Sequence, residues 1–183
     1  MRMIFDGIGG VNSGFNKLIQ AGSVTTDTSG SNINNVSPFV EVWNMEAAIL
    51  VSSPAIRTGD TVNVETVYSS ASGGTATWWF TNQTTHVSQG WFQTGVSGYY
   101  DGTHAEYIDE RPSRSDGSRY LLRKSTNITY WSGEYINGTQ SNSWPTTNVT
   151  MKDTDVLMTA VMGSTVTSSE AWKDCGPGLG TNQ

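Results

Sequence analysis

The stretch Thr103–Pro112 reads THAEYIDERP and combines strand-forming residues with a concentration of carboxylates that is unusual for this weakly charged chain. In an extended strand successive side chains point to opposite faces, so Tyr107 and Asp109 would lie on the face opposite to Glu106. The run is predicted to be a strand that ends at Pro112, and Glu106 is the first candidate for a catalytic carboxylate. An exposed acidic strand end explains the stretch equally well, because most carboxylates are simply solvated.

The composition of this 183-residue chain indicates an all-β fold. Charged residues make up only 14% of it, while Gly, Ser, Thr and Asn are abundant. Short runs with strand-like alternation recur between turn signals, as they do in sandwiches and barrels. We therefore expect an antiparallel two-sheet β-sandwich with very little helix. Because the length suits one domain, residues 1–183 are expected to form a single domain with an irregular tail at 171–183.

Charge and cysteine content exclude several classes of partner. The net charge is -6, and the basic residues gather mainly in Arg111–Lys124 without forming an aromatic-studded basic face, so nucleic acid is not an expected partner. The chain has one cysteine, Cys175, and its two histidines, His86 and His104, are too few for an obvious metal site. We expect no metal and no cofactor.

No apolar run approaches the roughly 20 residues of a membrane span, so a membrane partner is not expected. Residues 1–4 lead directly into the first predicted strand without the apolar core of a signal peptide. Asn-x-Ser/Thr sequons, for example at Asn82 and Asn127, give weak support for secretion. We expect a secreted, extracellular monomer in its mature form.

Two segments near the N-terminus predict a β-hairpin. Phe5–Gly10 reads FDGIGG and Leu18–Gly22 reads LIQAG. The link between them is rich in Gly, Asn and Ser, which is typical of a turn.

The segment Phe39–Trp43 reads FVEVW, and its alternation places Glu41 between Phe39 and Trp43 on one strand face. A carboxylate flanked by aromatics favours the wall of a solvated groove. The alternative is that the aromatics pack in the core and Glu41 is a paired buried acid, because an unpaired buried carboxylate is costly.

Trp78 and Trp79 are consecutive in the strand predicted for residues 75–81, so they must face opposite sides of it. Core packing is the preferred role for the aromatics of this part of the chain, but one of these two can line a surface. Residues 132–145 carry no strand pattern and are expected to be a surface connection.

Taken in order, FDGIGG, LIQAG, FVEVW and the AEYI of Ala105–Ile108 resemble the motifs of the glutamic peptidases (the eqolisin family, peptidase family G1). In that family a Trp-x-Gly-Ile-Asp-Gly-like segment leads to a catalytic Gln followed by x-Gly, and a distant Ala-Glu-Trp-Ile-like strand carries the catalytic Glu. Gln20 and Glu106 match those two positions, and Glu41 matches the acid of an aromatic-x-Glu-x-aromatic strand. The resemblance extends over Phe5–Met162. It implies a concanavalin/lectin-like sandwich of two antiparallel sheets, with the substrate lying across a groove on one sheet.

Three positions depart from the family motifs. The family's Asp in the first motif falls on Gly9, its leading Trp falls on Phe5, and the Trp after the catalytic Glu is Tyr107. Phe and Tyr can replace Trp as groove walls. Gly9 cannot replace a carboxylate, so either Asp6 takes over that role or the site works without it.

The resemblance implies an acid-acting endopeptidase that hydrolyses polypeptides without a metal or a nucleophilic side chain. Glu106 would activate a water and then protonate the leaving amine, while the Gln20 amide would stabilise the oxyanion. A carboxyl that serves as both base and acid works best near its own pKa, so acidic pH is expected. Further side chains expected to bind substrate or support the site are Phe5, Asp6, Phe39, Glu41, Trp43, Tyr107 and Asp109.

Two other functions fit the same residues. A β-sandwich glycoside hydrolase would use Glu41 and Glu106 as its carboxylate pair, about 5 to 5.5 Å apart if retaining and farther apart if inverting. A non-catalytic carbohydrate- or protein-binding sandwich would use exposed Trp and Tyr as contacts, with Glu106 in a structural role. The geometry that discriminates between them is whether Glu106 faces Gln20 or Glu41 alone.

Overall fold

The computed structural model divides the chain into two compact units, Met1–Gly117 and Ser118–Gln183. In the first unit it describes residues 2–10, 17–25, 36–100 and 104–110, and in the second it describes the strands. Side chains are described within residues 3–9, 18–25 and 36–100, and elsewhere the course of the backbone. The expectation of a single domain over the whole chain stays a prediction.

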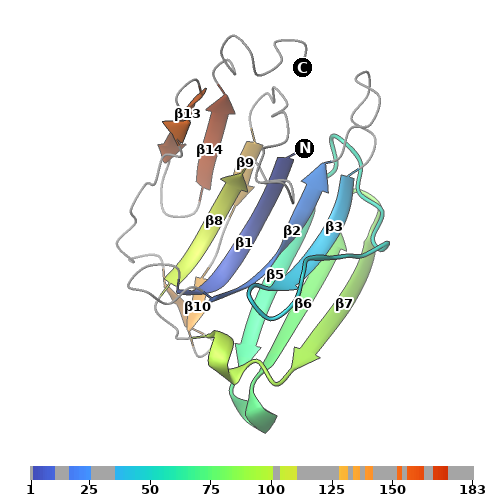
Figure 1. Cartoon of the computed structure of the whole chain (residues 1–183). Helices are drawn as coiled ribbons and strands as arrows, with labels where there is room; N and C mark the ends of the chain where they lie inside the picture. Colours follow the sequence, from blue (N-terminus) through green and yellow to red (C-terminus); the bar gives the residue numbers. More distant parts are fainter. Residues whose placement is uncertain are drawn as a thin grey trace. The chain divides into compact units, whose positions relative to one another are not determined.

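Five strands form the larger sheet of the first unit. They are β1 (Arg2–Gly10), β2 (Lys17–Thr25), β3 (Val36–Val42), β4 (Ile49–Leu50) and β8 (His104–Glu110). Their order across the sheet is β4-β3-β2-β1-β8, and every neighbouring pair is antiparallel. Figure 1 shows β8, β1, β2 and β3 side by side in this order. The predicted N-terminal hairpin is confirmed, and the stretch that contains Glu106 is a strand as expected.

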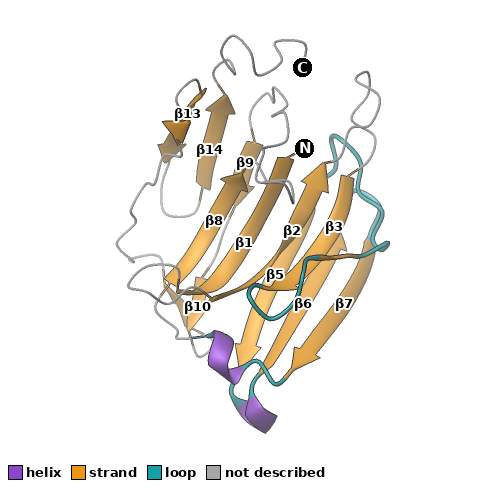
Figure 2. Ribbon diagram, in the orientation of Figure 1, coloured by secondary structure: helices purple, strands orange, loops and turns teal. Residues whose placement is uncertain are grey.

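Three strands form the smaller sheet of the same unit. They are β5 (Val62–Ser69), β6 (Thr75–Asn82) and β7 (Val87–Thr94), paired antiparallel in the order β5-β6-β7. Asn82 anchors the turn that follows β6: its amide oxygen accepts hydrogen bonds from two backbone N–H groups, and its Nδ2 donates to Asp60 Oδ2 at 2.8 Å. The helices among the described residues are two short 3-10 turns, Ala71–Gly73 and Ser97–Tyr99 (Figure 2).

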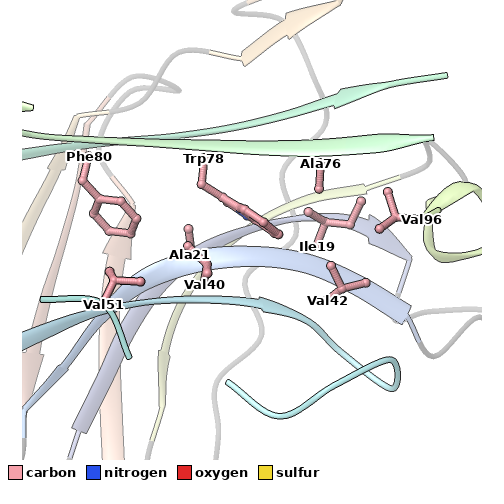
Figure 3. Close-up of a cluster of buried hydrophobic side chains, with 9 residues drawn as sticks. All are labelled: Ile19, Ala21, Val40, Val42, Val51, Ala76, Trp78, Phe80 and Val96. Atoms are coloured by element: carbon pink, nitrogen blue, oxygen red, sulfur yellow. The ribbon is translucent and has the colours of Figure 1, made fainter. Parts of the chain in front are cut away.

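A hydrophobic core fills the space between these two sheets. Figure 3 shows the side chains of β6 pointing toward those of β2 and β3. Its buried members are Ile19, Ala21, Val40, Val42, Val51, Ala76, Trp78, Phe80 and Val96. Trp78 is 1% exposed and Trp79 is 49% exposed, which confirms that the consecutive tryptophans face opposite sides of their strand. Burial of this apolar layer is the main force that holds the sheets together.

The opposite face of the five-stranded sheet carries a second buried cluster. Its members are Met3, Phe5, Leu18, Val24 and Phe39, with Trp43 packed against it. In the register Gly22 lies between Phe5 and Phe39, and a Cβ at Gly22 would lie 2.4 Å from Phe5 Cβ. Because Gly22 has no side chain, the two rings meet edge to face across β2, with centroids 5.7 Å apart.

The second unit contains a four-stranded sheet and a hairpin. Its strands are β9 (Ile128–Trp131), β10 (Glu134–Ile136), β11 (Thr139–Ser141), β12 (Lys152–Asp153), β13 (Val156–Met162) and β14 (Thr167–Trp172). The sheet order is β12-β13-β14-β9, and β10 pairs with β11. Residues 132–145 were expected to be a connection, which is wrong because they include the hairpin; its strands of three residues are too short for alternation to reveal. Strand β14 also continues to residue 172, inside the expected tail, and residues 173–183 lie outside the described residues.

The all-β prediction is confirmed, since each named strand pairs antiparallel with its neighbours (Figure 2). The two facing sheets of the first unit make the sandwich that the composition predicted. In the part of the chain that the structure describes, no helix is both long and apolar enough to cross a membrane.

Candidate active site

One row of residues crosses the five-stranded sheet at the level of Gln20. Gln20 on β2 pairs with Glu41 on β3 and with Gly7 on β1, and Gly7 pairs in turn with Glu106 on β8. Residues paired directly across antiparallel strands belong to the same face of a sheet. The register therefore places Glu41, Gln20, Gly7 and Glu106 in one line, on the face that carries the second cluster.

A glycine occupies the position between Gln20 and Glu106. Because β1 lies between their strands, the two backbones are two strand spacings apart, about 10 Å. Gln20 and Glu106 therefore do not come from neighbouring strands. A Cβ at Gly7 would lie 2.8 Å from Leu18 Cδ1, so even an alanine there would collide with Leu18. Gly7 thus adds no side chain to the row, and the Leu18 side chain lies over the position between the two residues that match the family's catalytic pair.

The carboxylate of Glu41 fixes the orientation of the Gln20 amide. Gln20 Nε2 donates a hydrogen bond to Glu41 Oε2. Since a carboxylate can only accept, the NH₂ group of Gln20 must be the end that faces Glu41, and this group carries a second N–H for another acceptor. Gln20 is only 6% exposed, so the amide is held within the protein surface in one orientation.

Glu41 is a partly buried acid with an amide partner. Burial raises the pKa of Glu41 above its ordinary value, the Gln20 hydrogen bond opposes part of that rise, and the negative charge of Glu46 adds to it. A turn after β3 brings Glu46 back toward the site, with its backbone N–H donating to Val42 O at 3.2 Å. The arrangement matches the paired-acid alternative for FVEVW.

The aromatic residues of the site are more buried than expected. Phe5 and Phe39 are 4% and 0% exposed, so the expectation that they form walls of a solvated groove is wrong: they pack against each other in the second cluster. Trp43 is partly buried against the same cluster. Its backbone N–H donates to Leu18 O at 2.8 Å, which extends the β2–β3 pairing beyond Glu41. These residues support the sheet beside Gln20.

Three of the expected supporting residues occupy the opposite face of the sheet. Asp6 pairs with Ala21 on β2 and with Tyr107 on β8, while Asp109 pairs with Ile4. Strand positions alternate between faces, so all three belong to the face that packs on the smaller sheet. Of the two alternatives for position 9, the one in which Asp6 takes over the role of the missing carboxylate is therefore wrong, because the two positions are three apart in the strand and face opposite sides of the sheet.

Gly9 lies on the same face as Gln20, paired with Leu18 and His104. Its φ of 145° is in the region that favours glycine. An aspartate there would need a backbone conformation that L-residues rarely adopt. The departure from the family motif at this position thus coincides with a backbone that suits glycine.

Sequence reasoning overlooked Gly7, Leu18 and Glu46 as residues that shape the site. Gly7 and Leu18 are inside quoted motifs, but their importance becomes visible only with the register that places Leu18 beside Gly7. Glu46 acts through a turn that the alternating pattern does not predict. Among the described side chains, no three from His, Cys, Asp and Glu form a group that could hold a metal ion.

Two solved structures share this fold over nearly the whole chain. Aspergilloglutamic peptidase from Aspergillus niger aligns with a TM-score of 0.75 and 17% identity, covering 94% of this chain and 98% of its own. Scytalido-glutamic peptidase, solved with a peptide-based transition-state analogue, aligns with a TM-score of 0.66 and 18% identity, covering 94% of this chain and 83% of its own. At such identities the likeness concerns the fold alone. No curated protein sequence matches the chain.

The family assignment comes from the sequence. The model of the Peptidase A4 family matches residues 3–173, a span that includes Gln20, Glu41 and Glu106. The match covers the ordered motifs and most of the chain, so the resemblance noted from those motifs is confirmed. This chain belongs to the Peptidase A4 family, the glutamic peptidases or eqolisins.

Proposed function

We propose that this peptidase is an acid-acting endopeptidase in which Glu106 activates the attacking water and Gln20 stabilises the oxyanion. The observation that carries the proposal is the row across the sheet, in which Gln20 and Glu106 occupy one line and one face with Gly7 between them. A peptidase of this family acts on polypeptides, and in this proposal the scissile amide lies across the row, within reach of both residues. We expect it to act as a secreted monomer.

Gln20 is suited to the oxyanion role because its amide is already oriented. One N–H of its NH₂ group is donated to Glu41, and the second is the donor that would bind the developing oxyanion. Donors that are held in place before the reaction need no reorganisation in the transition state. Glu41 thus acts as a positioning residue, and Phe39 and Trp43 support the strand segment that carries it.

Glu106 is assigned the proton-transfer role. As a carboxylate it takes a proton from water while the water oxygen attacks the amide carbon; the protonated acid then delivers that proton to the leaving nitrogen as the C–N bond breaks. The same group must be ionised for the first step and protonated for the second. Activity is therefore expected in the acidic range, near the pKa of a carboxyl group.

The row disfavours a glycoside hydrolase built on Glu41 and Glu106. Three strand spacings separate their backbones, about 14 Å, whereas a retaining pair of carboxyl groups is about 5 to 5.5 Å apart and an inverting pair about 6.5 to 9.5 Å. Glu41 is also committed to the Gln20 amide. A purely binding role for the sandwich is disfavoured by membership of a peptidase family.

The direct test is to incubate the protein with a denatured protein substrate from about pH 2 to 7, the range in which carboxyl groups titrate. We expect peptides to appear at acidic pH and to persist in the presence of metal chelators and of serine- and cysteine-directed reagents. Glu106→Gln should abolish them. Its matched control is Glu65→Gln, the same change at an exposed position of β5, which should leave hydrolysis intact.

Three results would contradict the proposal. One is the absence of peptides at every pH with a folded protein. Another is loss of activity with chelators. The third is hydrolysis of a polysaccharide, but not of protein, that depends on both Glu41 and Glu106.

A further inference from the structure

A carboxyl group that the proposed mechanism does not use lies partly buried on the inner face of the sandwich. Asp6 is on the face of β1 that packs on the smaller sheet, opposite Ala21 of β2. Its Oδ1 is buried and makes no hydrogen bond. Thr66 of β5, on the facing sheet, lies close enough for its hydroxyl to favour the ionised carboxylate, yet its Oγ1 also lacks a hydrogen bond of normal geometry. The two polar groups therefore meet in the interior without satisfying each other.

Burial of a charged carboxylate without a partner is costly, whereas the neutral acid is tolerated far better. Burial raises the pKa of Asp6 from 3.8 to about 7, with the Thr66 hydroxyl opposing part of the rise.

We infer that Asp6 is a proton-dependent contact between the two sheets of the first unit: the sandwich packs with this carboxyl protonated and loosens when the proton is lost. The protein would then be stable in acid and lose stability toward neutral pH, independently of how Glu106 and Gln20 act.

The direction follows from linkage. The pKa of Asp6 is higher in the folded than in the unfolded state. The stability that Asp6 contributes is therefore fully present below about pH 4 and is lost as the pH rises toward 7. Within that window the ratio of folded to unfolded protein should fall about tenfold per pH unit, or about a thousandfold in all.

Other titratable groups near Asp6 must be separated from it. Tyr68 is on the same face of β5 as Thr66 and stacks on Tyr100 with ring centroids 4.1 Å apart. On β8 the register partner of Asp6 is Tyr107, and Asp109 is two residues further along. Ala21, which pairs with Asp6 on β2, and Trp78, which pairs with Thr66 on β6, are not titratable. None of the described side chains on this inner face is Lys, Arg or His. The same face of β1 and β2 also carries Arg2 and Lys17, four residues along their strands from Asp6 and from Ala21.

The test is to measure unfolding by urea from about pH 4 to 8, across the window set by the two pKa values. Wild type should lose about a thousandfold in the folded-to-unfolded ratio, and Asp6→Asn should lose most of that pH dependence. Glu65→Gln is the matched control, because it is the exposed neighbour of Thr66 on the other face of β5, and it should behave as wild type. If Asp6→Asn keeps the wild-type pH dependence, or if Asp109→Asn removes it instead, the inference is overturned.

Two further measurements do not depend on the folding of Asp6→Asn. In wild type labelled with ¹³C-aspartate, one carboxyl assigned to Asp6 should titrate well above the ordinary range, and titration near 3.8 would overturn the inference. Thr66→Val keeps the side-chain shape but removes the hydroxyl that favours ionisation, so it should move the titration of Asp6 to higher pH. A shift to lower pH, or none, would also contradict the proposed contact.

Discussion

The two faces of the five-stranded sheet hold a buried acid in different ways. On one face Glu41 accepts a hydrogen bond from the Gln20 amide; on the other, Oδ1 of Asp6 is buried without a hydrogen bond. Burial raises the pKa of both groups, while the Gln20 amide opposes the rise at Glu41 and the Thr66 hydroxyl opposes it at Asp6, whose pKa reaches about 7. Desolvation disfavours the charged form of both acids. On one face Glu41 forms an oriented polar pair with Gln20, and on the other face Asp6 needs a proton.

The largest expected effect is on the catalytic face. Glu106→Gln removes the proton acceptor and nearly preserves shape, so hydrolysis should fall by at least the roughly 10²–10⁴-fold typical of general acid–base catalysis. The urea midpoint at acidic pH should stay close to that of wild type, in contrast to changes on the inner face. Initial rates of peptide release and urea unfolding measure the two quantities. If the variant loses activity only in proportion to the protein that has unfolded, Glu106 does not take part in the mechanism.

Gln20→Ala should cost on the order of 10²–10³-fold in rate, the loss expected when an oxyanion donor is removed. Gln20→Glu is the sharper variant, because it places a second carboxyl beside Glu41 that donates only when protonated, and like charges raise one pKa of the pair. Its residual activity should move to more acidic pH. A wild-type rate and pH profile for Gln20→Glu would show that Gln20 is not the oxyanion donor.

Gly9→Asp tests whether the family's missing carboxylate can simply be restored. At a φ of 145° an aspartate is strained, so the free energy of unfolding should fall by about 1–3 kcal/mol. Activity should not rise above wild type. Gly9→Ala, which carries the same backbone strain without the charge, is the control for denaturant unfolding. A Gly9→Asp protein that is as stable as wild type and faster would indicate that the backbone adapts and that the acid was needed.

Glu41→Gln tests the orientation of the Gln20 amide. The variant keeps an acceptor, but its amide can also present a donor, so the orientation of Gln20 is no longer dictated by charge. We expect kcat to fall on the order of tenfold, the size of one net hydrogen bond to a charged group, with KM little changed. A change confined to KM would instead make Glu41 a substrate contact.

The smallest expected effect concerns the charge of Glu46. Glu46→Gln removes a negative neighbour and should lower the pKa of Glu41 while leaving that of Asp6 unchanged, because the two acids are on opposite faces. Because the folded-state pKa of Glu41 is raised, the protein loses some stability as the pH rises through that pKa. Glu46→Gln brings this pKa closer to its ordinary value, so the loss of stability should be smaller in the variant. Carboxyl titration by ¹³C NMR measures both groups, and equal shifts at both would contradict the separation of the faces.

Much of this molecule was predictable from local pattern. Alternation identified the strand around Glu106, the opposite orientations of Trp78 and Trp79, and the shared face of Phe39 and Glu41, because side chains alternate along any strand. The ordered motifs were sufficient to suggest the family. The short strands of 134–136 and 139–141 escaped detection, since three residues carry too little periodicity.

The order of the strands decided what pattern alone could not. Gln20 and Glu41 are 21 residues apart in the chain, and only the pairing of β2 with β3 brings the amide to the carboxylate. Pairing of β1 with both β2 and β8 puts Gly7 between Gln20 and Glu106, and it places Asp6 on the opposite face, which packs on the smaller sheet. The sequence by itself determined which residues alternate within each strand, whereas register and sheet packing decided which acids obtain partners, because those contacts depend on strands distant in the chain.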